Sequence, residues 1–140
     1  MELMEKHVQT KIPMVSWYKN NKLIKTTPLK LYYLGKWKMK GTIFSNQAGI
    51  TLIGTWVIPT VVGTPGTIQN TVTGANGYLS VNDNTDAGSV VVEEALDSSD
   101  VGQQWERSAN DSSGFFTLKN PNSGLFLTMK TDHTLTIGNA

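Results

Sequence analysis

The stretch at residues 103–120, QQWERSANDSSGFFTLKN, has a weaker copy of itself upstream, GTWVIPTVVGTPGTIQN at residues 54–70. In each, one tryptophan, Trp56 or Trp105, precedes a short strand-like segment that ends in an asparagine. The offset is 49 residues between the tryptophans (105 − 56) and 50 between the final asparagines (120 − 70). A nearly constant offset indicates one supersecondary unit used more than once. Such a unit cannot bury its apolar face alone, so we expect the copies to pack together, with the two indoles at matching interior positions.

The length and composition of the chain are those of a protein with a single folded core of modest size. Its 140 residues fit one domain, and a hydrophobic share of 39% suits a globular protein. Charged residues are scarce at 16%, and there is no cysteine. The missing thiols exclude disulfides, thiolate metal sites and cysteine nucleophiles together.

The charge is divided unevenly along the chain. Residues 1–40 carry nine lysines against two glutamates, a balance of +7, whereas residues 41–140 carry three basic and nine acidic residues, a balance of −6. We interpret residues 1–40 as an exposed, poorly ordered basic extension and residues 41–140 as the folded domain. Contact of the extension with nucleic acid or anionic lipid is the alternative. Because its lysines are scattered, specific nucleic-acid recognition is not expected.

One long uncharged run raises the question of a membrane span. Apolar residues between positions 50 and 58 fall at every second position, which is the spacing of a strand, and the run at 49–68 contains four glycines and two prolines. We therefore expect no membrane span. The first residues are charged and have no apolar stretch typical of a secretory signal, which predicts a cytoplasmic or unconventionally secreted protein.

Short strands separated by turn-forming clusters are expected throughout the folded domain. The turns are rich in Gly, Asn, Asp and Ser, and strands every 8–12 residues indicate an all-β barrel or sandwich. The expected strands are 41–45, 50–58, 66–69, 77–81, 89–95, 104–108, 115–119, 125–129 and 134–137. Core positions are expected at Val90, Val92, Leu118, Leu125, Leu127, Leu135 and Ile137.

The order of motifs in residues 66–140 resembles the ricin B-type β-trefoil lectins. Repeats of that family open on a strand ending in Asn, continue with Ser/Thr-Gly and a Tyr-Leu-Asp-Val-like strand, and close on Gln-x-Trp. Here TIQN (67–70), TG (73–74), YLSV (78–81) and QQW (103–105) follow in that order, and a second opening begins at residues 116–128. Upstream, Gly54 stands where the glutamine of a preceding Gln-x-Trp is expected. The resemblance implies a β-trefoil-like fold, incomplete or irregular, with one clear repeat and partial repeats.

The resemblance also implies where a sugar would bind. Sugar-binding members use an aspartate after the leucine of the second strand, an aromatic ring on a later strand, and an asparagine before Gln-x-Trp. This chain has Ser80, Glu93 and Gly102 at those places, and Thr128 at the aspartate position of the partial repeat. Polar residues nearby offer substitutes, since a sugar needs fixed polar partners beside an apolar platform. The candidate carbohydrate-binding residues are Ser80, Asp83, Asn84, Glu93 and Gln103. Gln103, Trp105 and Trp56 are assigned a structural role, because a buried amide must be hydrogen-bonded.

Catalysis has no support in the sequence. The two histidines, His7 and His133, lie far apart, and no nucleophile, nucleotide or metal-ligand motif is present. We expect no enzyme activity, no cofactor and no metal. The predicted function is a lectin-like module that recognises a glycan or glycoprotein through shallow loop sites. The alternative is a β-trefoil that binds protein, of the protease-inhibitor or adaptor type; neither the sugar nor the oligomeric state follows from the sequence.

Overall fold

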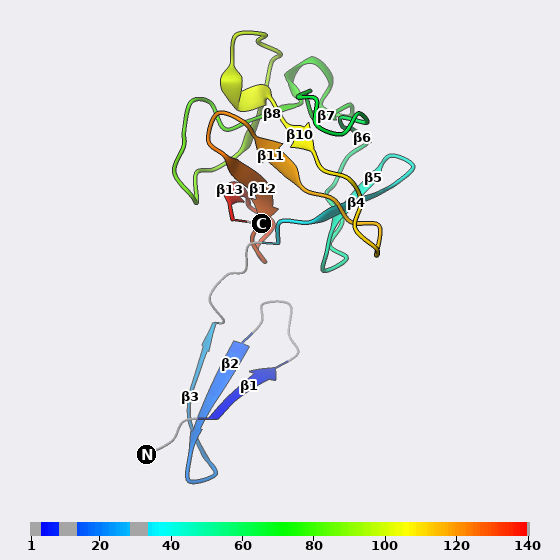
Figure 1. The fold of residues 1–140 in the computed structure, drawn as a ribbon. Helices are drawn as coiled ribbons and strands as arrows, with labels where there is room; N and C mark the ends of the chain where they lie inside the picture. The colour runs from blue at the N-terminus through cyan, green and yellow to red at the C-terminus, as the bar shows by residue number, and fades with distance from the viewer. Residues whose placement is uncertain (1–3, 9–13, 29–33, 140) are drawn as a thin grey trace. The chain divides into compact units, whose positions relative to one another are not determined.

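The computed structural model describes residues 4–8, 14–28 and 34–139, and it places side chains for residues 18–23 and 34–139 (Figure 1). Contacts divide the chain into two compact units, Met1–Tyr32 and Tyr33–Ala140. This division falls before the predicted boundary at residue 40, so Trp37 lies in the second unit. The described residues form strands and turns with only two short 3₁₀ helices, η1 (Gly74–Asn76) and η2 (Val101–Gln103), which confirms the all-β prediction.

The first unit is an antiparallel sheet of three strands in the order β1 (Met4–Val8), β2 (Met14–Lys19) and β3 (Lys22–Pro28). Asn20 and Asn21 join β2 to β3 with φ values of 53° and 63°. Two consecutive residues with positive φ are typical of the two-residue hairpin turn that matches the twist of its strands, and asparagine adopts this conformation more readily than most residues.

The second unit contains ten short strands in one hairpin and two four-stranded sheets. The hairpin pairs β4 with β5, one sheet has the order β6-β7-β8-β9, and the other has the order β10-β11-β12-β13. All of these pairings are antiparallel. The strands are β4 (Trp37–Lys40), β5 (Ile43–Asn46), β6 (Trp56–Val57), β7 (Gln69–Asn70), β8 (Tyr78–Ser80), β9 (Val92–Glu94), β10 (Glu106–Arg107), β11 (Leu118–Asn120), β12 (Leu125–Met129) and β13 (Leu135–Gly138).

Most expected strands coincide with these elements, but the one expected at 50–58 is wrong. Thr51 makes an isolated bridge to Ser45, and the chain then turns before Trp56 pairs with Asn70. The turn includes Gly54, whose φ of 140° is a conformation that residues with a side chain rarely adopt. The alternating apolar residues at 50–58 therefore belong to two separate strand pairings and not to one strand.

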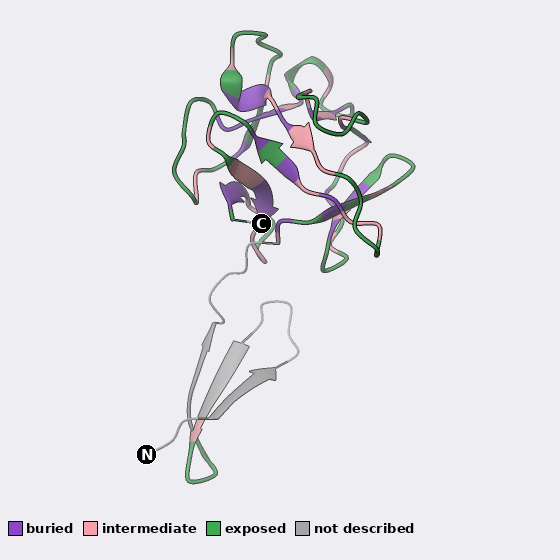
Figure 2. Ribbon diagram, viewed as in Figure 1, coloured by how far each residue is buried: buried purple, intermediate pink, exposed green. Residues whose placement is uncertain are grey.

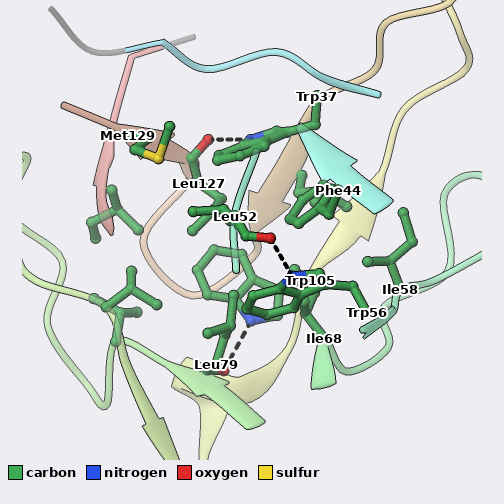
Figure 3. Close-up of a cluster of buried hydrophobic side chains, with 14 of the residues drawn as sticks. Trp37, Phe44, Leu52, Trp56, Ile58, Ile68, Leu79, Trp105, Leu127 and Met129 are labelled. Atoms are coloured by element: carbon green, nitrogen blue, oxygen red, sulfur yellow. Dashed lines mark hydrogen bonds between the residues drawn. The ribbon is translucent and has the colours of Figure 1, made fainter. Parts of the chain in front are cut away.

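Three buried indoles form the centre of the second unit (Figure 3). Trp56 donates its Nε1–H to the carbonyl of Leu52 at 3.3 Å, and Trp105 donates to the carbonyl of Leu79 at 3.1 Å. The two rings therefore occupy matching interior positions, as predicted. A third indole makes the same bond, because Nε1 of Trp37 lies 2.9 Å from the carbonyl oxygen of Leu127.

The backbone hydrogen bonds of the three tryptophans show the same threefold relation. The amide N–H groups of Trp56, Trp105 and Trp37 donate to the carbonyls of residues 42, 66 and 116 at 3.1, 2.8 and 2.8 Å. Each acceptor lies four residues before a buried asparagine, at 46, 70 and 120. Each asparagine side chain then accepts backbone N–H groups from the turn that follows it. Each tryptophan thus pairs with the repeat before it, and Trp37 pairs with the last repeat, which closes the ring.

The first repeat is shorter than the second. Ten residues separate Asn46 from Trp56, whereas 35 separate Asn70 from Trp105 (56 − 46 and 105 − 70). Residues 47–55, all of which the structure describes, contain no counterpart of β9. A search for one constant offset cannot find this repeat, and the charge boundary at residue 40 places Trp37 in the predicted extension.

The buried residues of the second unit form one hydrophobic core, and they lie mainly on its strands (Figure 2). Phe44, Ile68 and Leu118, each two residues before a repeat asparagine, are fully buried, and Trp37 stacks on Phe44 with ring centroids 4.5 Å apart. Of the predicted core residues, three are buried and two are partly buried against the core: Leu118, Leu127 and Ile137, then Leu125 and Leu135. The prediction for Val90 and Val92 is wrong: they are 51% and 40% exposed, and Val91 between them is buried. The alternation is offset by one residue, which moves each side chain to the opposite face.

Candidate functional site

A shallow depression of about 710 Å³ opens beside the second repeat. Three segments that the sheet and the ring hold together form it: the turn after β8, the end of β9, and the loop that leads into η2. Its lining residues are Asn82, Asp83, Glu94, Ala95, Leu96, Asp97 and Asp100. Four of these carry carboxylates, and Leu96 is an apolar side chain that is 56% exposed. The depression therefore offers several oxygen acceptors around one apolar surface.

Ser80, a predicted binding residue, lies beneath this surface. It is fully buried, its hydroxyl donates to Oδ2 of Asp100 at 2.6 Å, and its oxygen accepts the N–H of Asn82 at 2.9 Å. Oδ1 of Asp100 also accepts the N–H of Gly102 at 2.8 Å, which caps the first turn of η2. Two donors therefore fix the Asp100 carboxylate in one orientation. The serine at the family's aspartate position holds a different aspartate in place.

A steric constraint explains why glycine, Gly102, stands at the family's asparagine position. A Cβ atom at residue 102 would overlap the backbone N, Cα and O atoms of Asn82. The carbonyl of Gly102 also accepts the N–H of Val81 at 3.1 Å, so the two loops are held in direct contact. Asn82 itself has a φ of 58°, which turns the chain sharply after β8. No residue with a side chain fits at position 102 without moving this turn.

Gln103 has the structural role that its sequence context predicts. It is 1% exposed, its Nε2 donates to the carbonyl of Ala95 at 2.8 Å, and its Oε1 accepts the N–H of Asp97 at 3.0 Å. These two bonds fix the backbone on both sides of Leu96. Gln103 therefore positions one wall of the depression and is not exposed to it.

The remaining predicted residues divide between the depression and its surroundings. Asp83 lines it; Asn84 is exposed in the same turn and is not part of the lining. Glu93 is exposed on β9, opposite Leu79, and also lies outside the lining. Its neighbour Glu94 lines the depression, because consecutive residues of a strand face opposite sides. With its amide nitrogen toward Glu94, Asn82 donates to both carboxylate oxygens at 3.2 and 3.3 Å.

Asp97 is held in its ionised form by its own loop. Oδ1 accepts the hydroxyl and the backbone N–H of Ser99, at 2.6 and 2.9 Å. The hydroxyl bond, followed by the backbone bond, lowers the pKa of Asp97 below its ordinary value. Its charge is therefore present at neutral and mildly acidic pH.

The sequence prediction missed Leu96, Asp97 and Asp100. The signal available for them was the acidic turn LDSSD at 96–100, which directly precedes Gln-x-Trp. Nothing in that pattern indicates that the turn folds back beside Asp83. This proximity depends on the contact between Gly102 and Asn82.

Two further findings concern the described part of the chain. Among those residues, no group of three or more His, Cys, Asp or Glu side chains is placed so that it could hold a metal ion. A search of the same residues found no helix with the length and apolar character needed to cross a membrane.

The threefold ring of indoles and asparagines defines the second unit as a β-trefoil-like domain. The sequence profile of the family described as ricin-type beta-trefoil lectin domain-like matches residues 55–140, and the chain belongs to that family. Domains of this family are generally non-catalytic. The matched range begins after Trp37 and Asn46, so the shortened first repeat lies outside it. Comparison with curated proteins and with solved structures gave no match.

Proposed function

We propose that the second unit is a carbohydrate-binding module and that the depression beside the second repeat is its binding site. The observation that carries this proposal is the fixed carboxylate of Asp100, held by Ser80 and Gly102 next to the exposed side chain of Leu96. Carbohydrate recognition requires polar groups of fixed orientation and an apolar surface for the C–H face of the sugar. The family membership of the chain supports the same function.

Each lining residue has a role in this proposal. Asp100 and Asp83 accept hydrogen bonds from sugar hydroxyls, and Glu94 does so while Asn82 orients its carboxylate. Leu96 takes the place of the aromatic platform used by sugar-binding relatives. A leucine provides less apolar contact than an aromatic ring, so a single site binds weakly, and tight binding requires several sites or subunits.

A glycan array followed by titration calorimetry tests the proposal. Asp83→Asn and Glu94→Gln each replace a lining carboxylate by an amide of the same shape, and we expect either change to weaken binding of the selected glycan at least fivefold. Asp86→Asn is the matched control, since Asp86 is exposed in the same loop and outside the lining. Equal losses in all three variants, or no glycan retained at high protein concentration, would contradict the proposal.

A protein-binding function is the second candidate, and one observation favours it. A separate hollow of about 450 Å³ is lined by Pro65, Val101, Gln104, Pro121 and Asn122. Its lining is more apolar than that of the acidic depression, as expected of a site for an apolar peptide side chain. Val101→Asp would abolish binding of a protein partner at this hollow. If the module binds glycans through the acidic depression, the same change leaves glycan affinity unaltered.

A further inference from the structure

The second repeat differs from the last repeat in its charge. Between Asn70 and Trp105 the chain carries six acidic residues and no lysine, arginine or histidine. Residues 106–140, by contrast, carry three acidic residues, three basic residues and one histidine. Four of the six acidic residues line the depression, namely Asp83, Glu94, Asp97 and Asp100. The negative charge of the second repeat is therefore gathered at the proposed glycan site.

The last repeat shows that the fold itself does not require these carboxylates. The two leucines that accept equivalent indole bonds are 48 residues apart (127 − 79), which places Thr131 where the second repeat has Asp83. In the strand pairs, Glu94 lies opposite residue 78 and Gly138 lies opposite the equivalent residue 126. The last repeat therefore folds with a threonine and a glycine in these two places. The charge at positions 83 and 94 is a property of the depression and not of the repeat.

The side chains that line the depression are almost entirely hydrogen-bond acceptors. A carboxylate only accepts, and the one lining side chain with a strong donor, the amide of Asn82, directs that donor at Glu94. Among the residues that the structure describes, none of the four lining carboxylates forms an ion pair with a basic side chain. A sugar hydroxyl both donates and accepts, whereas an ammonium group has three donors and no acceptor. An ammonium group therefore matches this lining better than a hydroxyl does.

The size and shape of the depression favour an organic cation that contains a ring. Its volume of about 710 Å³ lies within the range of about 300–1,000 Å³ that is usual for small-molecule sites. The exposed side chain of Leu96 offers an apolar surface to one face of such a ring. The carboxylates do not converge on one point, since no group of three or more acids in the described part of the chain is placed to hold a metal ion. Separated acids are better met by an extended ligand than by a single ion.

We propose that the depression selects sugars that carry a protonated amine, such as hexosamines without an N-acetyl group, over N-acetylated and anionic sugars. This selectivity rests on the glycan-binding function proposed for the same depression. The ammonium group takes the place of one sugar hydroxyl and donates to Asp83 and Glu94. The fixed carboxylate of Asp100 accepts from a ring hydroxyl, and the C–H face of the ring lies on Leu96. An N-acetyl group removes the positive charge and an anionic sugar adds a repulsion, so both bind more weakly.

Titration calorimetry of the full chain with two matched trisaccharides tests the proposal. The glucosamine trimer carries an amine on each sugar, and its fully N-acetylated form carries none. At mildly acidic pH, where the sugar amines are protonated, we expect the glucosamine trimer to bind about tenfold more tightly at low salt, and we expect the ratio to fall at high salt because salt screens exposed charges. Equal affinities for the two trimers would overturn the proposal and leave the glycan-binding function in place.

Two variants test whether the preference comes from the lining. Asp83→Asn and Glu94→Gln each remove one lining charge and keep the shape of the side chain, and we expect each to lower the ratio of the two affinities by about threefold. Asp86→Asn is the control, because it removes the same charge from the same loop outside the lining and should leave the ratio unchanged. An unchanged ratio in the first two variants, or an equal fall in all three, would contradict the proposal.

A peptide separates recognition of an amino sugar from attraction by charge alone. Trilysine with blocked ends carries one ammonium group per residue, as the glucosamine trimer carries one per sugar, but it has no ring to place on Leu96. We expect trilysine to bind more weakly than the glucosamine trimer, and equal binding would assign the depression to basic peptides and overturn the proposal. If neither trimer binds while the glycan array retains a neutral or anionic glycan, the amine preference is wrong and the glycan-binding function stands. If the array retains no glycan, both fail.

Discussion

Gly102 determines the shape of the acidic depression, because the absence of a side chain lets its loop lie directly against the backbone of Asn82. We predict that Gly102→Ala lowers the free energy of unfolding by about 1–3 kcal/mol, the usual cost of forcing a methyl group into a packed site. The added Cβ must displace the Asn82 backbone, which moves Asp83 and weakens ligand binding as well. Urea denaturation measures the first effect and calorimetry with the glycan the second. Val101→Ala, at a neighbouring residue that is 46% exposed, is the control and should change stability little.

Asp97 gives a prediction for pH dependence. Its pKa is lowered chiefly by the Ser99 hydroxyl, so the folded state favours the carboxylate form. A lowered pKa in the folded state contributes stability above the unfolded value of about 3.9, and this contribution is lost as the pH falls through the folded value. In an NMR titration of the Asp97 carboxyl, Ser99→Ala should raise the midpoint, although the backbone bond from residue 99 keeps it below the ordinary value. An unchanged midpoint would show that the hydroxyl is not the cause.

At the scale of residues, the sequence predicts chemical roles better than it predicts neighbours. The burial of Trp105 and the hydrogen bonding of Gln103 follow from residue type and context, and both are observed. Glu93 is a candidate because it stands at the family's aromatic position, whereas the structure places its neighbour Glu94 in the lining of the depression, on the other face of the strand. Whether Ser80, Asp83, Asn84, Glu93 or Gln103 contributes to binding remains a prediction.

At the scale of elements, β4 completes the ring through Trp37. We predict that Trp37→Phe destabilises the second unit by about 1–3 kcal/mol, because the carbonyl of Leu127 loses its donor in a buried place. The smaller ring also loses contact with Phe44. Tyr78→Phe is the control: it removes a hydroxyl that has no partner among the residues the structure describes, and it should shift stability by about 0.5 kcal/mol or less. Denaturant unfolding with equal midpoints for the wild type and Trp37→Phe would exclude the structural role of Trp37.

Elements that repeat at a fixed distance were predictable, and the shortened element was not. The pairs Trp56–Trp105 and Asn70–Asn120 give a common offset, whereas Asn46 and Trp37 belong to a repeat that lacks a counterpart of β9. Their equivalence is visible only in the hydrogen bonds, where Trp37 bonds to Leu127 as Trp105 bonds to Leu79. When a repeat lacks a strand, the spacing in the sequence no longer shows that its residues are equivalent to those of the other repeats. The packing of the side chains still shows it.

At the scale of the whole molecule, the buried hydrophobic core found among the described residues lies between Trp37 and Ile137, inside the second unit. We therefore predict that a chain of residues 33–140 folds cooperatively, with a midpoint of thermal unfolding within a few degrees of that of the full chain. It should keep its affinity for the glycan, because every lining residue of the depression belongs to it. Calorimetric unfolding and the glycan-binding assay on the same preparation test both points. A fragment that fails to fold would show that the ring depends on the first unit, and a folded fragment without affinity for the glycan would contradict the placement of the whole site in the second unit.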